Sequence, residues 1–277
     1  MTQRPVKSPL VQVPSGVPSQ LAGTAPSHPP MARTGLTVSR VVSSEENLQS
    51  KAKIPPAVFD YFSKIEDWRK QTNTQYTGNV ATNNFQMFLY SQTLKLFKED
   101  TINVCETGFN GGHSASLFLL SDPRVRYYGW DLGVYSAAKV VAKKLSEEFP
   151  GRLQVMWGDS KKTVPSFFEQ NSLLCDLVVI DGEHSYNGVQ SDLGVISKHM
   201  KGKWQVFVDD CEALNQGILK AFDEAMLQLP GSHIYKYKNS KLPSPGFCQA
   251  SNFVTPAMLT DLAARPELGN HSTARLL

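Results

Sequence analysis

Carboxylates close five consecutive apolar segments of this chain, and they are the side chains whose type and spacing could do chemistry. They are Glu106, Asp131, Asp159, Asp181 and the pair Asp209 and Asp210. In an open parallel sheet ligands bind beyond the carboxyl ends of the strands, so we expect these acids to gather at one edge. Any single acid could instead cap the helix that follows it, an alternative that stays open for Asp131 and Asp159.

The first of these segments leads into a glycine-rich turn. The apolar run 102–105 is followed by the letters ETGFNGGHS over residues 106–114 and then by an apolar helical pattern. Glycine accepts dihedrals that a Cβ forbids, and the N-terminus of the next helix directs free N–H groups at a ligand. The pattern therefore predicts a strand, a turn and a helix that bind a nucleotide-like cofactor. An ordinary tight strand–helix turn is the alternative.

Glu106 distinguishes between classes of cofactor. A dinucleotide fingerprint laid over Gly108 and Gly111 would need its first glycine at position 106. A carboxylate at that position repels a pyrophosphate, whereas it can accept hydrogen bonds from an ammonium group. The turn thus favours a cofactor with a cationic amino-acid end over a nicotinamide dinucleotide.

These residues resemble motif I of the class I S-adenosylmethionine (SAM) methyltransferases, E/D-x-G-x-x-x-G. The match is carried by Glu106, Gly108 and Gly112. The resemblance implies that SAM binds at this turn. Beyond motif I, Asp131 lies 23 residues after Gly108, near the spacing at which an acid meets a ribose. The remaining residues expected to contact the cofactor are Asn110, His113, Ser114, Asp159 and Ser160 (the last two at the adenine), and Asp181.

A second segment, DGEHSYNGV over residues 181–189, narrows the resemblance. Together with residues 108–114 it is similar to the metal-dependent sugar O-methyltransferases of macrolide and aminocoumarin pathways, over roughly residues 100–215. The resemblance implies that Asp181, Asp209 and Asp210 bind Mg²⁺. This chain departs from the pattern at Glu183, where relatives often have Asp, and at Gly111, where many have Ala.

The chemistry of the acids agrees with a metal. Three converging carboxylates raise one another's pKa unless a cation neutralises them, and oxygen ligands favour Mg²⁺, or Mn²⁺ or Ca²⁺, over zinc. The alternative is that Asp209 or Asp210 caps a helix beginning near Glu212. Methyl transfer to a hydroxyl also needs a base, for which His184 is preferred to Glu183 because its ordinary pKa is near neutral. A loop histidine bonded to backbone is the alternative for His184.

The order of patterns predicts an α/β fold: a Rossmann-like, doubly wound sheet of the class I methyltransferase type. Helical patterns cover 56–71, 83–98, 136–149, 164–170, 188–199 and 212–229, and strand patterns alternate with them from residue 101. The last two strands, near 233–237 and 247–254, are joined by a Pro- and Gly-containing turn at 242–246, which predicts a hairpin and an antiparallel last strand. A short helix and a frayed end are expected over 256–277.

We predict two regions, a disordered Pro- and Ser-rich extension over 1–50 and a methyltransferase domain over 51–277. The domain's leading helices, about 54–99, are expected to form part of a lid. Residues 1–44 carry four basic residues and no acid, so the formal charge of +3 leaves −1 (3 − 4) for the rest. Without a basic stripe in the globular part, nucleic acid is not expected as a ligand.

The apolar runs and the cysteines indicate where in the cell the protein is expected. No apolar run approaches the roughly 18 to 20 residues of a membrane span. The four cysteines lack C-x-x-C spacing and lie in apolar patterns, so we expect buried, unpaired thiols in a reducing compartment and neither disulfides nor zinc. These features predict a cytoplasmic protein, with organelle import through the N-terminal extension as an alternative.

The sequence therefore predicts a SAM-dependent enzyme that methylates a hydroxyl of a small molecule with help from Mg²⁺. A metal-free N- or carboxyl-methyltransferase and a SAM-binding module without catalysis are the alternatives, and a nicotinamide-dependent oxidoreductase is disfavoured by Glu106. The acceptor and the oligomeric state are left open, a homo-oligomer included.

Overall fold

The computed structural model describes residues 54–72, 78–229, 231–237 and 246–264. All of them belong to the larger of the two units into which the chain divides, Gly35–Leu277. The predicted N-terminal extension, most of the predicted turn at 242–246 and the predicted chain end beyond 264 lie outside the described residues. Within the described ranges, no helix is long and apolar enough to cross a membrane.

The described strands form one seven-stranded sheet in the order β3-β2-β1-β4-β5-β7-β6. The pairs among β1 to β5 are parallel, and β7 pairs antiparallel with both β5 and β6. This arrangement confirms the doubly wound sheet with an antiparallel last strand. The strands are β1 (Ile102–Thr107), β2 (Val125–Asp131), β3 (Leu153–Trp157), β4 (Cys175–Ile180), β5 (Met200–Val208), β6 (His233–Tyr237) and β7 (Phe247–Ser251).

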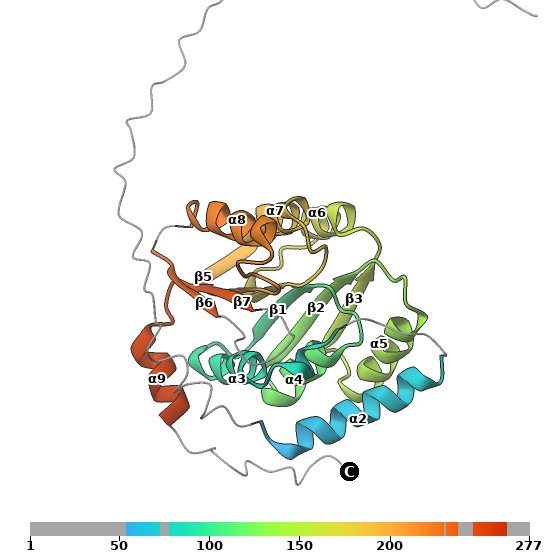
Figure 1. The fold of residues 1–277 in the computed structure, drawn as a ribbon. Coiled ribbons are helices and arrows are strands. Elements are labelled where there is room, and N and C mark those ends of the chain that lie inside the picture. Colours follow the sequence, from blue (N-terminus) through green and yellow to red (C-terminus); the bar gives the residue numbers. More distant parts are fainter. Residues whose placement is uncertain (1–53, 73–77, 230, 238–245, 265–277) are drawn as a thin grey trace, which may run out of the picture. The chain divides into compact units, whose positions relative to one another are not determined.

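Helices cover both faces of the sheet (Figure 1). One face is covered by α3 (Asn84–Thr93), α4 (His113–Ser121) and α5 (Ser136–Glu148), with α2 (Pro56–Lys70) packed against α4 and α5. The other face carries α6 (Ser160–Gln170), α7 (Tyr186–Ile196) and α8 (Gln216–Met226), and α9 (Pro256–Ala264) ends the described chain. Short 3-10 helices lie at Val80–Thr82, Leu94–Leu96 and Ser197–His199.

Alternation along the strands separates the apolar side chains into two cores. In β1, Val104 belongs to the core under α2 to α5, and the next residue, Cys105, belongs to the core under α6 to α8. Both side chains are fully buried. Because both faces are covered, the central parallel strands read as continuous apolar runs, which is the pattern that predicted them.

Two helices begin four residues away from their predicted starts, and both differences concern candidate site acids. Helix α6 starts at Ser160, four residues earlier than predicted, because the Asp159 side chain accepts a hydrogen bond from the Lys161 amide (3.0 Å) and caps it. Helix α8 starts only at Gln216, with Asn215 at its N-cap. The alternative that Asp209 or Asp210 caps this helix is therefore wrong.

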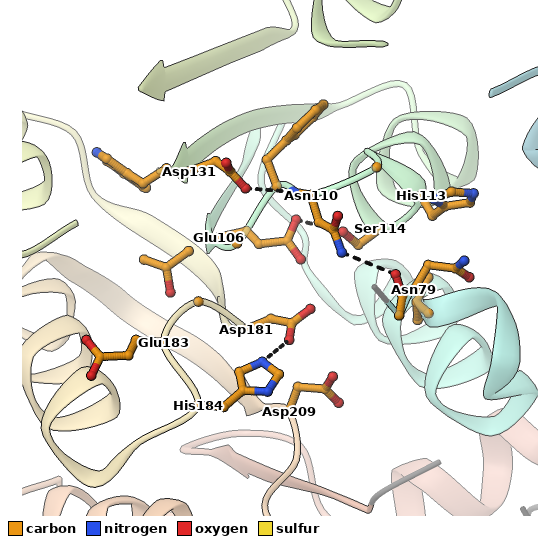
Figure 2. Close-up of a pocket in the computed structure, with 18 of the residues that line it drawn as sticks. Asn79, Glu106, Asn110, His113, Ser114, Asp131, Asp181, Glu183, His184 and Asp209 are labelled. Carbon is orange, nitrogen blue, oxygen red and sulfur yellow. Dashed lines mark hydrogen bonds and ion pairs between the residues drawn. The ribbon is translucent and has the colours of Figure 1, made fainter. Parts of the chain in front are cut away.

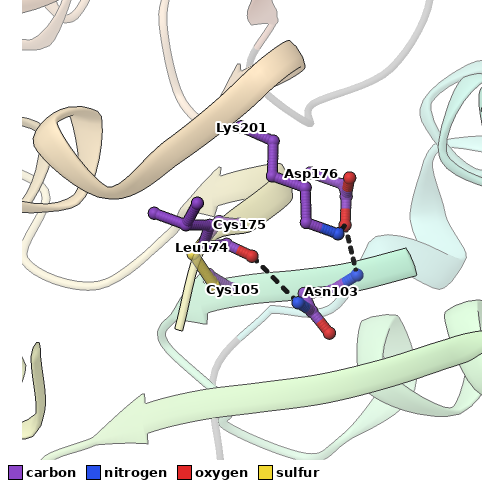
Figure 3. Close-up of a disulfide and its surroundings, with 6 residues drawn as sticks. All are labelled: Asn103, Cys105, Leu174, Cys175, Asp176 and Lys201. Atoms are coloured by element: carbon purple, nitrogen blue, oxygen red, sulfur yellow. Dashed lines mark hydrogen bonds and ion pairs between the residues drawn. A yellow bond between two sulfur atoms is a disulfide. The ribbon is translucent and has the colours of Figure 1, made fainter. Parts of the chain in front are cut away.

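The prediction of unpaired thiols is also wrong, although all four cysteines are buried as expected. Cys105 is bonded to Cys175 across β1 and β4 (Figure 3), and Cys211 is bonded to Cys248 across the end of β5 and β7. The partners are 70 and 37 residues apart in sequence. Strand order brings them together, since β4 lies beside β1 and β7 beside β5. Spacing along the chain could not reveal either pair.

The first disulfide joins Cys175, at the start of β4, to Cys105, the residue before Glu106 in β1. Beside it the buried carboxylate of Asp176 accepts hydrogen bonds from the Asn103 amide and from the Lys201 ammonium group, both at 2.7 Å (Figure 3). A buried carboxylate is tolerated only when it is paired in this way. The covalent and ionic contacts together fasten β1, β4 and β5 to one another.

Candidate active site

A cavity of about 870 Å³ opens at the carboxyl ends of the strands (Figure 2). Its wall contains nearly every side chain that the sequence singled out. These are Glu106, Gly108, Asn110, His113, Ser114, Asp131, Asp159, Ser160, Asp181, Glu183, His184, Asp209 and Asp210. The gathering of acids predicted from the parallel strands is thus what the fold produces.

The glycine turn between β1 and α4 is built by close backbone approach. Gly108 has φ +94°, and a Cβ at this position would lie 2.0 Å from the Asp181 carbonyl oxygen. Only glycine fits so close to the end of β4. Asn110 also has a positive φ of 47°, and its amide donates a hydrogen bond to Asp131 at 2.8 Å. The turn is therefore locked onto the ends of both neighbouring strands.

Gly112 is the predicted residue that does not line the cavity. Its φ is +75°, and a Cβ there would meet the Phe109 ring at 2.8 Å and Val141 of α5 at 2.9 Å. The motif requires glycine at this position because α4 begins against the core, and contact with a ligand is not the reason.

Glu106 is completely buried, on the face of β1 that looks toward α4. Its Oε2 accepts a hydrogen bond from Ser114 Oγ at 2.8 Å and another from the Tyr127 hydroxyl. Its Oε1 has no hydrogen-bond partner among the described residues. Burial raises the pKa of the Glu106 carboxyl to about 8, against the opposing effect of the two hydroxyl donors. The free oxygen is a ready acceptor for a cationic group entering the cavity.

The acids after β2 and β3 are both held by backbone. Asp131 accepts hydrogen bonds from the amides of Asn110 and Gly133, at 2.8 and 2.7 Å. Asp159 caps α6, as its alternative reading supposed, and it lines the cavity with Ser160 as well. Capping and ligand contact are thus compatible at this position, because a carboxylate oxygen accepts more than one hydrogen bond.

A histidine stands between the acids that follow β4 and β5. The His184 ring lies 3.2 Å from Asp181 Oδ1 through Nε2 and 2.6 Å from Asp210 Oδ2 through Nδ1. Hydrogen bonds to Asp181 and then to Asp210 raise the pKa of His184 to about 10. At neutral pH the ring is therefore a cation that donates through both nitrogens and has no lone pair with which to accept a proton.

The same acids are partly buried. Burial raises the pKa of Asp181, and burial followed by the neighbouring charges of Asp181 and Asp210 raises the pKa of Asp209 well above its usual range. Asp210 itself adopts a left-handed φ of 54°, which the fold holds in the turn after β5. Oxygen donors of the kind that Mg²⁺ prefers are thus present at this end of the cavity. Within the part of the chain that the structure describes, however, no three His, Cys, Asp or Glu side chains are arranged as an ion site.

Glu183 lies apart from this cluster. It is exposed, and in Figure 2 its side chain points away from Asp181 and His184. Lys161 Nζ lies 2.6 Å from one of its oxygens and Ser185 Oγ lies 2.6 Å from the other. The hydrogen bond from Lys161 holds the pKa of Glu183 below its usual range. Of the two predicted bases, only His184 touches the acids after β4 and β5.

Two residues of α3 that line the cavity, Gln86 and Tyr90, were not identified from the sequence. Gln86 donates hydrogen bonds from Nε2 to Asp209 Oδ1 (2.8 Å) and to the Tyr90 hydroxyl (3.0 Å), and Tyr90 is buried in the cavity wall. The helix had been predicted from its apolar face alone. The signal that could have revealed Gln86 is its amide within that face, because a buried polar side chain requires a partner.

His113 lines the cavity as a cofactor contact would require, and it also makes contacts that the sequence did not predict. It begins α4 in the cavity wall, but Nε2 lies 3.1 Å from Glu66 Oε1 of α2 and its ring packs edge-on against Phe62. Burial lowers the pKa of His113 to about 4, so the ring is neutral at neutral pH. The pair joins the leading helix to the cofactor turn.

Comparison with known proteins agrees with this geometry. Residues 105–211 match the family model described as a methyltransferase domain. No curated protein matches. These 107 residues begin within β1, at Cys105, and end at Cys211, so they contain the glycine turn and all six candidate acids but not α3.

Solved structures show the same fold. The O-methyltransferase TomG from Streptomyces achromogenes, involved in tomaymycin synthesis and solved with SAM, has 17% identity and a TM-score of 0.56, covering 75% of this chain and 97% of that one. An O-methyltransferase from Bacillus cereus, solved with S-adenosylhomocysteine (SAH), has 13% identity and a TM-score of 0.53, covering 76% and 96%. The SAH-bound methyltransferase PaMTH1 from Podospora anserina has 14% identity and a TM-score of 0.50, covering 74% and 92%.

The family match over the strands and turns that carry the site, and the fold shared with these structures, lead to one assignment. Residues 105–211 match a methyltransferase domain, and the chain has the Rossmann-like fold of these O-methyltransferase structures.

Proposed function

We propose that this protein uses SAM to methylate a hydroxyl group of a small molecule, with Mg²⁺ assisting. The observation that carries the proposal is a single cavity with two unlike ends. One end has the glycine turn and the free oxygen of Glu106, and the other has His184 among Asp181, Asp209 and Asp210.

The first end suits the cofactor. Glu106 Oε1 would accept a hydrogen bond from the ammonium group of SAM, and Asp131 at the end of β2 would receive the ribose hydroxyls. Asp159 and Ser160, after β3, would lie at the adenine. The N-terminus of α4, whose first N–H groups have no partner within the helix, would face the rest of the amino-acid end.

The second end suits the acceptor. In the reaction the acceptor oxygen forms a bond to the methyl carbon, the carbon–sulfur bond breaks, and its electron pair stays on sulfur, while the hydroxyl proton passes to a base. His184, which contacts the acids, is the candidate base in the state in which Mg²⁺ would neutralise Asp181 and Asp210 and leave one ring nitrogen without its proton. Glu183 is the second candidate. Bound Mg²⁺ would lower the pKa of the acceptor hydroxyl and fix its oxygen, with Asp181, Asp209 and Asp210 as the ligands.

The first experiment is calorimetric titration of the purified protein with SAH, with NAD as the control and a second run after chelation. Binding of SAH without a response to NAD supports the cofactor assignment and justifies a screen of hydroxylated acceptors with Mg²⁺. Binding of NAD alone, or of neither compound, contradicts it. Binding of SAH without turnover on any acceptor would favour a SAM-binding module that lacks catalysis.

One observation favours a second function, metal-free transfer to nitrogen or to a carboxylate. The His184 cation already stands between Asp181 and Asp210, and the described residues contain no arrangement of an ion site. Turnover that is the same with and without chelator would support this second function and would remove Mg²⁺ from the first.

The cytoplasmic location predicted from unpaired cysteines loses that support, because structural disulfides persist mainly in oxidising compartments. We propose that the chain works where its disulfides survive. Alkylation of free thiols in lysates of cells that express it, followed by mass spectrometry, counts the modified cysteines. Four modified cysteines would restore the cytoplasmic prediction.

A further inference from the structure

Tyr127, in the middle of β2, makes a contact that nothing in the sequence motif requires. Its side chain is completely buried, yet its hydroxyl donates a hydrogen bond to Glu106 Oε2 on the neighbouring strand. A tyrosine buried between a sheet and its helices needs a partner for the hydroxyl, but an apolar residue would fill the same place without that need. Packing alone therefore does not explain why residue 127 carries a hydroxyl group.

The strand register explains how the contact is reached. Glu106 of β1 lies directly opposite Gly129 of β2, and Tyr127 lies two residues before Gly129, so all three share one face of the sheet. A Cβ on Gly129 would lie 2.8 Å from the Tyr127 ring and 3.1 Å from its hydroxyl oxygen. The missing side chain at 129 leaves room for the Tyr127 ring to lie along the strand and reach the carboxylate.

The ring is also held from the side of the cofactor turn. Phe109, the residue after Gly108, packs edge-on against Tyr127 with 6.2 Å between the ring centroids. Ser114 of α4 donates to the same carboxylate oxygen as Tyr127 does. Two donors on Oε2 fix the plane of the carboxylate and leave Oε1 without a partner among the described residues.

We propose that Tyr127 is a positioning residue for cofactor binding, which fixes the Glu106 carboxylate so that Oε1 meets the cationic ammonium of the cofactor. The inference rests on the proposed function, since it assumes that SAM binds here. Tyr127 does not line the cavity and so does not touch the ligand. It acts through Glu106, and Gly129 is the residue that makes its reach possible.

The charges around Glu106 also support a positioning role for Tyr127. The groups that face Glu106 are Tyr90 of α3, Tyr127 and Asp131 of β2, and Asp181 and Asp209 after β4 and β5. The acids disfavour the ionised form of Glu106, and the Tyr127 and Ser114 hydroxyls favour it. A bound ammonium needs the ionised form, so the two hydroxyls hold the carboxyl closer to the state that binds.

The test is SAH affinity measured by calorimetry over pH 6 to 9, with Tyr127→Phe as the variant and Tyr128→Phe as the matched control. Tyr128 packs against Phe167 on the opposite face of the sheet, so its hydroxyl cannot reach Glu106. Loss of one hydrogen bond to a charged group predicts about a tenfold or greater loss of affinity for Tyr127→Phe and no change for Tyr128→Phe.

The pH profile separates positioning from general loosening. Removing one donor raises the pKa of Glu106, so the pH at which SAH affinity reaches its plateau should move upward in Tyr127→Phe. A purely structural loss would lower affinity equally at every pH. In a Glu106→Gln background the effect of Tyr127→Phe should nearly vanish, because the group that it positions is gone.

Gly129→Ala tests the same contact with the hydroxyl still present. The added methyl would displace the Tyr127 ring, so SAH affinity should fall while thermal unfolding shows that the protein is still folded. Tyr127→Phe with unchanged SAH affinity, or with an equal loss in the Glu106→Gln background, would overturn the inference. A wild-type protein that does not bind SAH would instead overturn the proposed function, a result that is read before any variant is made.

Discussion

At the cofactor end of the cavity one carboxyl group, Glu106, lies among neutral hydroxyl donors, whereas at the acceptor end two acids, Asp181 and Asp210, contact the charged ring of His184. The first arrangement keeps an oxygen free, and the second engages Asp181 and Asp210 with a cation that the protein itself supplies. A lone buried acid can stay protonated until a cation arrives, but a cluster of acids needs a positive charge at all times. The comparison teaches that the two ends hold their carboxyl groups in opposite ways, one with an oxygen left free and the other with two acids bonded to a histidine.

We expect the largest effect from Gly108→Ala, because Gly108 is where the cofactor turn packs against the backbone of Asp181 at the acceptor end. Its Cβ would lie 2.0 Å from the Asp181 carbonyl oxygen, so the turn and the end of β4 must separate. We expect loss of SAH binding and a large fall in the thermal unfolding midpoint. The control is Gly151→Ala, which has a similar positive φ (+72°) but open space, and which should cost only about 1 to 2 kcal/mol. Equal effects of the two variants would contradict the close-approach argument.

Asp210→Ala should separate the two ends. We expect it to abolish metal-dependent turnover and leave SAH affinity nearly unchanged, because Asp210 belongs to the acceptor end. Since Asp210 has a left-handed φ of 54°, Asp210→Asn is the companion variant, which tolerates that backbone and removes only the charge. Activity assays with and without chelator, beside SAH titrations, measure both. A parallel loss of SAH binding in both variants would show that the ends are not separable.

His184→Gln against Glu183→Gln sharpens the assignment within the acceptor end. His184 contacts Asp181 and Asp210, whereas Glu183 contacts Lys161 and Ser185. We expect turnover to fall about 100-fold or more for His184→Gln, the usual scale for loss of an acid–base group, and only a few-fold for Glu183→Gln. Steady-state kinetics on an accepted hydroxyl substrate decide. The reverse ranking would make Glu183 the base.

The smallest expected effect is on the stability of the ligand-free protein. The pKa of Glu106 is raised from 4.5 to about 8 in the folded state, so folding favours its protonated form. Its contribution to the free energy of unfolding is therefore fully present below about pH 4.5 and is lost as pH rises through 8. Other raised groups act in the same direction, so the measurement is the difference in pH slope between wild type and Glu106→Gln in denaturant titrations. Identical slopes would place Glu106 in a wetter environment than the structure does.

The sequence patterns predicted where the acids would gather, but they did not predict which side chains contact those acids. The acids reached one cavity because parallel strands end at one edge, a rule that needs no side-chain detail. The donors that hold two of those acids, Tyr127 and Gln86, come from a neighbouring strand and from α3, and the paired cysteines also come from different segments. The distances along the chain carry no sign of these contacts. The predicted start of α6 was wrong because it followed the apolar periodicity, whereas the helix begins at the cap that Asp159 provides.

The disulfide between Cys211 and Cys248 begins one residue after Asp210, and the one between Cys105 and Cys175 ends one residue before Glu106. Each end of the cavity therefore borders a covalent cross-link. A preparation in which a thiol reductant has broken these disulfides differs covalently from one made without reductant. The acids are then the same, but the strands that carry them are no longer cross-linked. With two disulfides the chain has several covalent species, and any activity recorded for it belongs to one of them, so the oxidation state of the sample has to be stated with the rate.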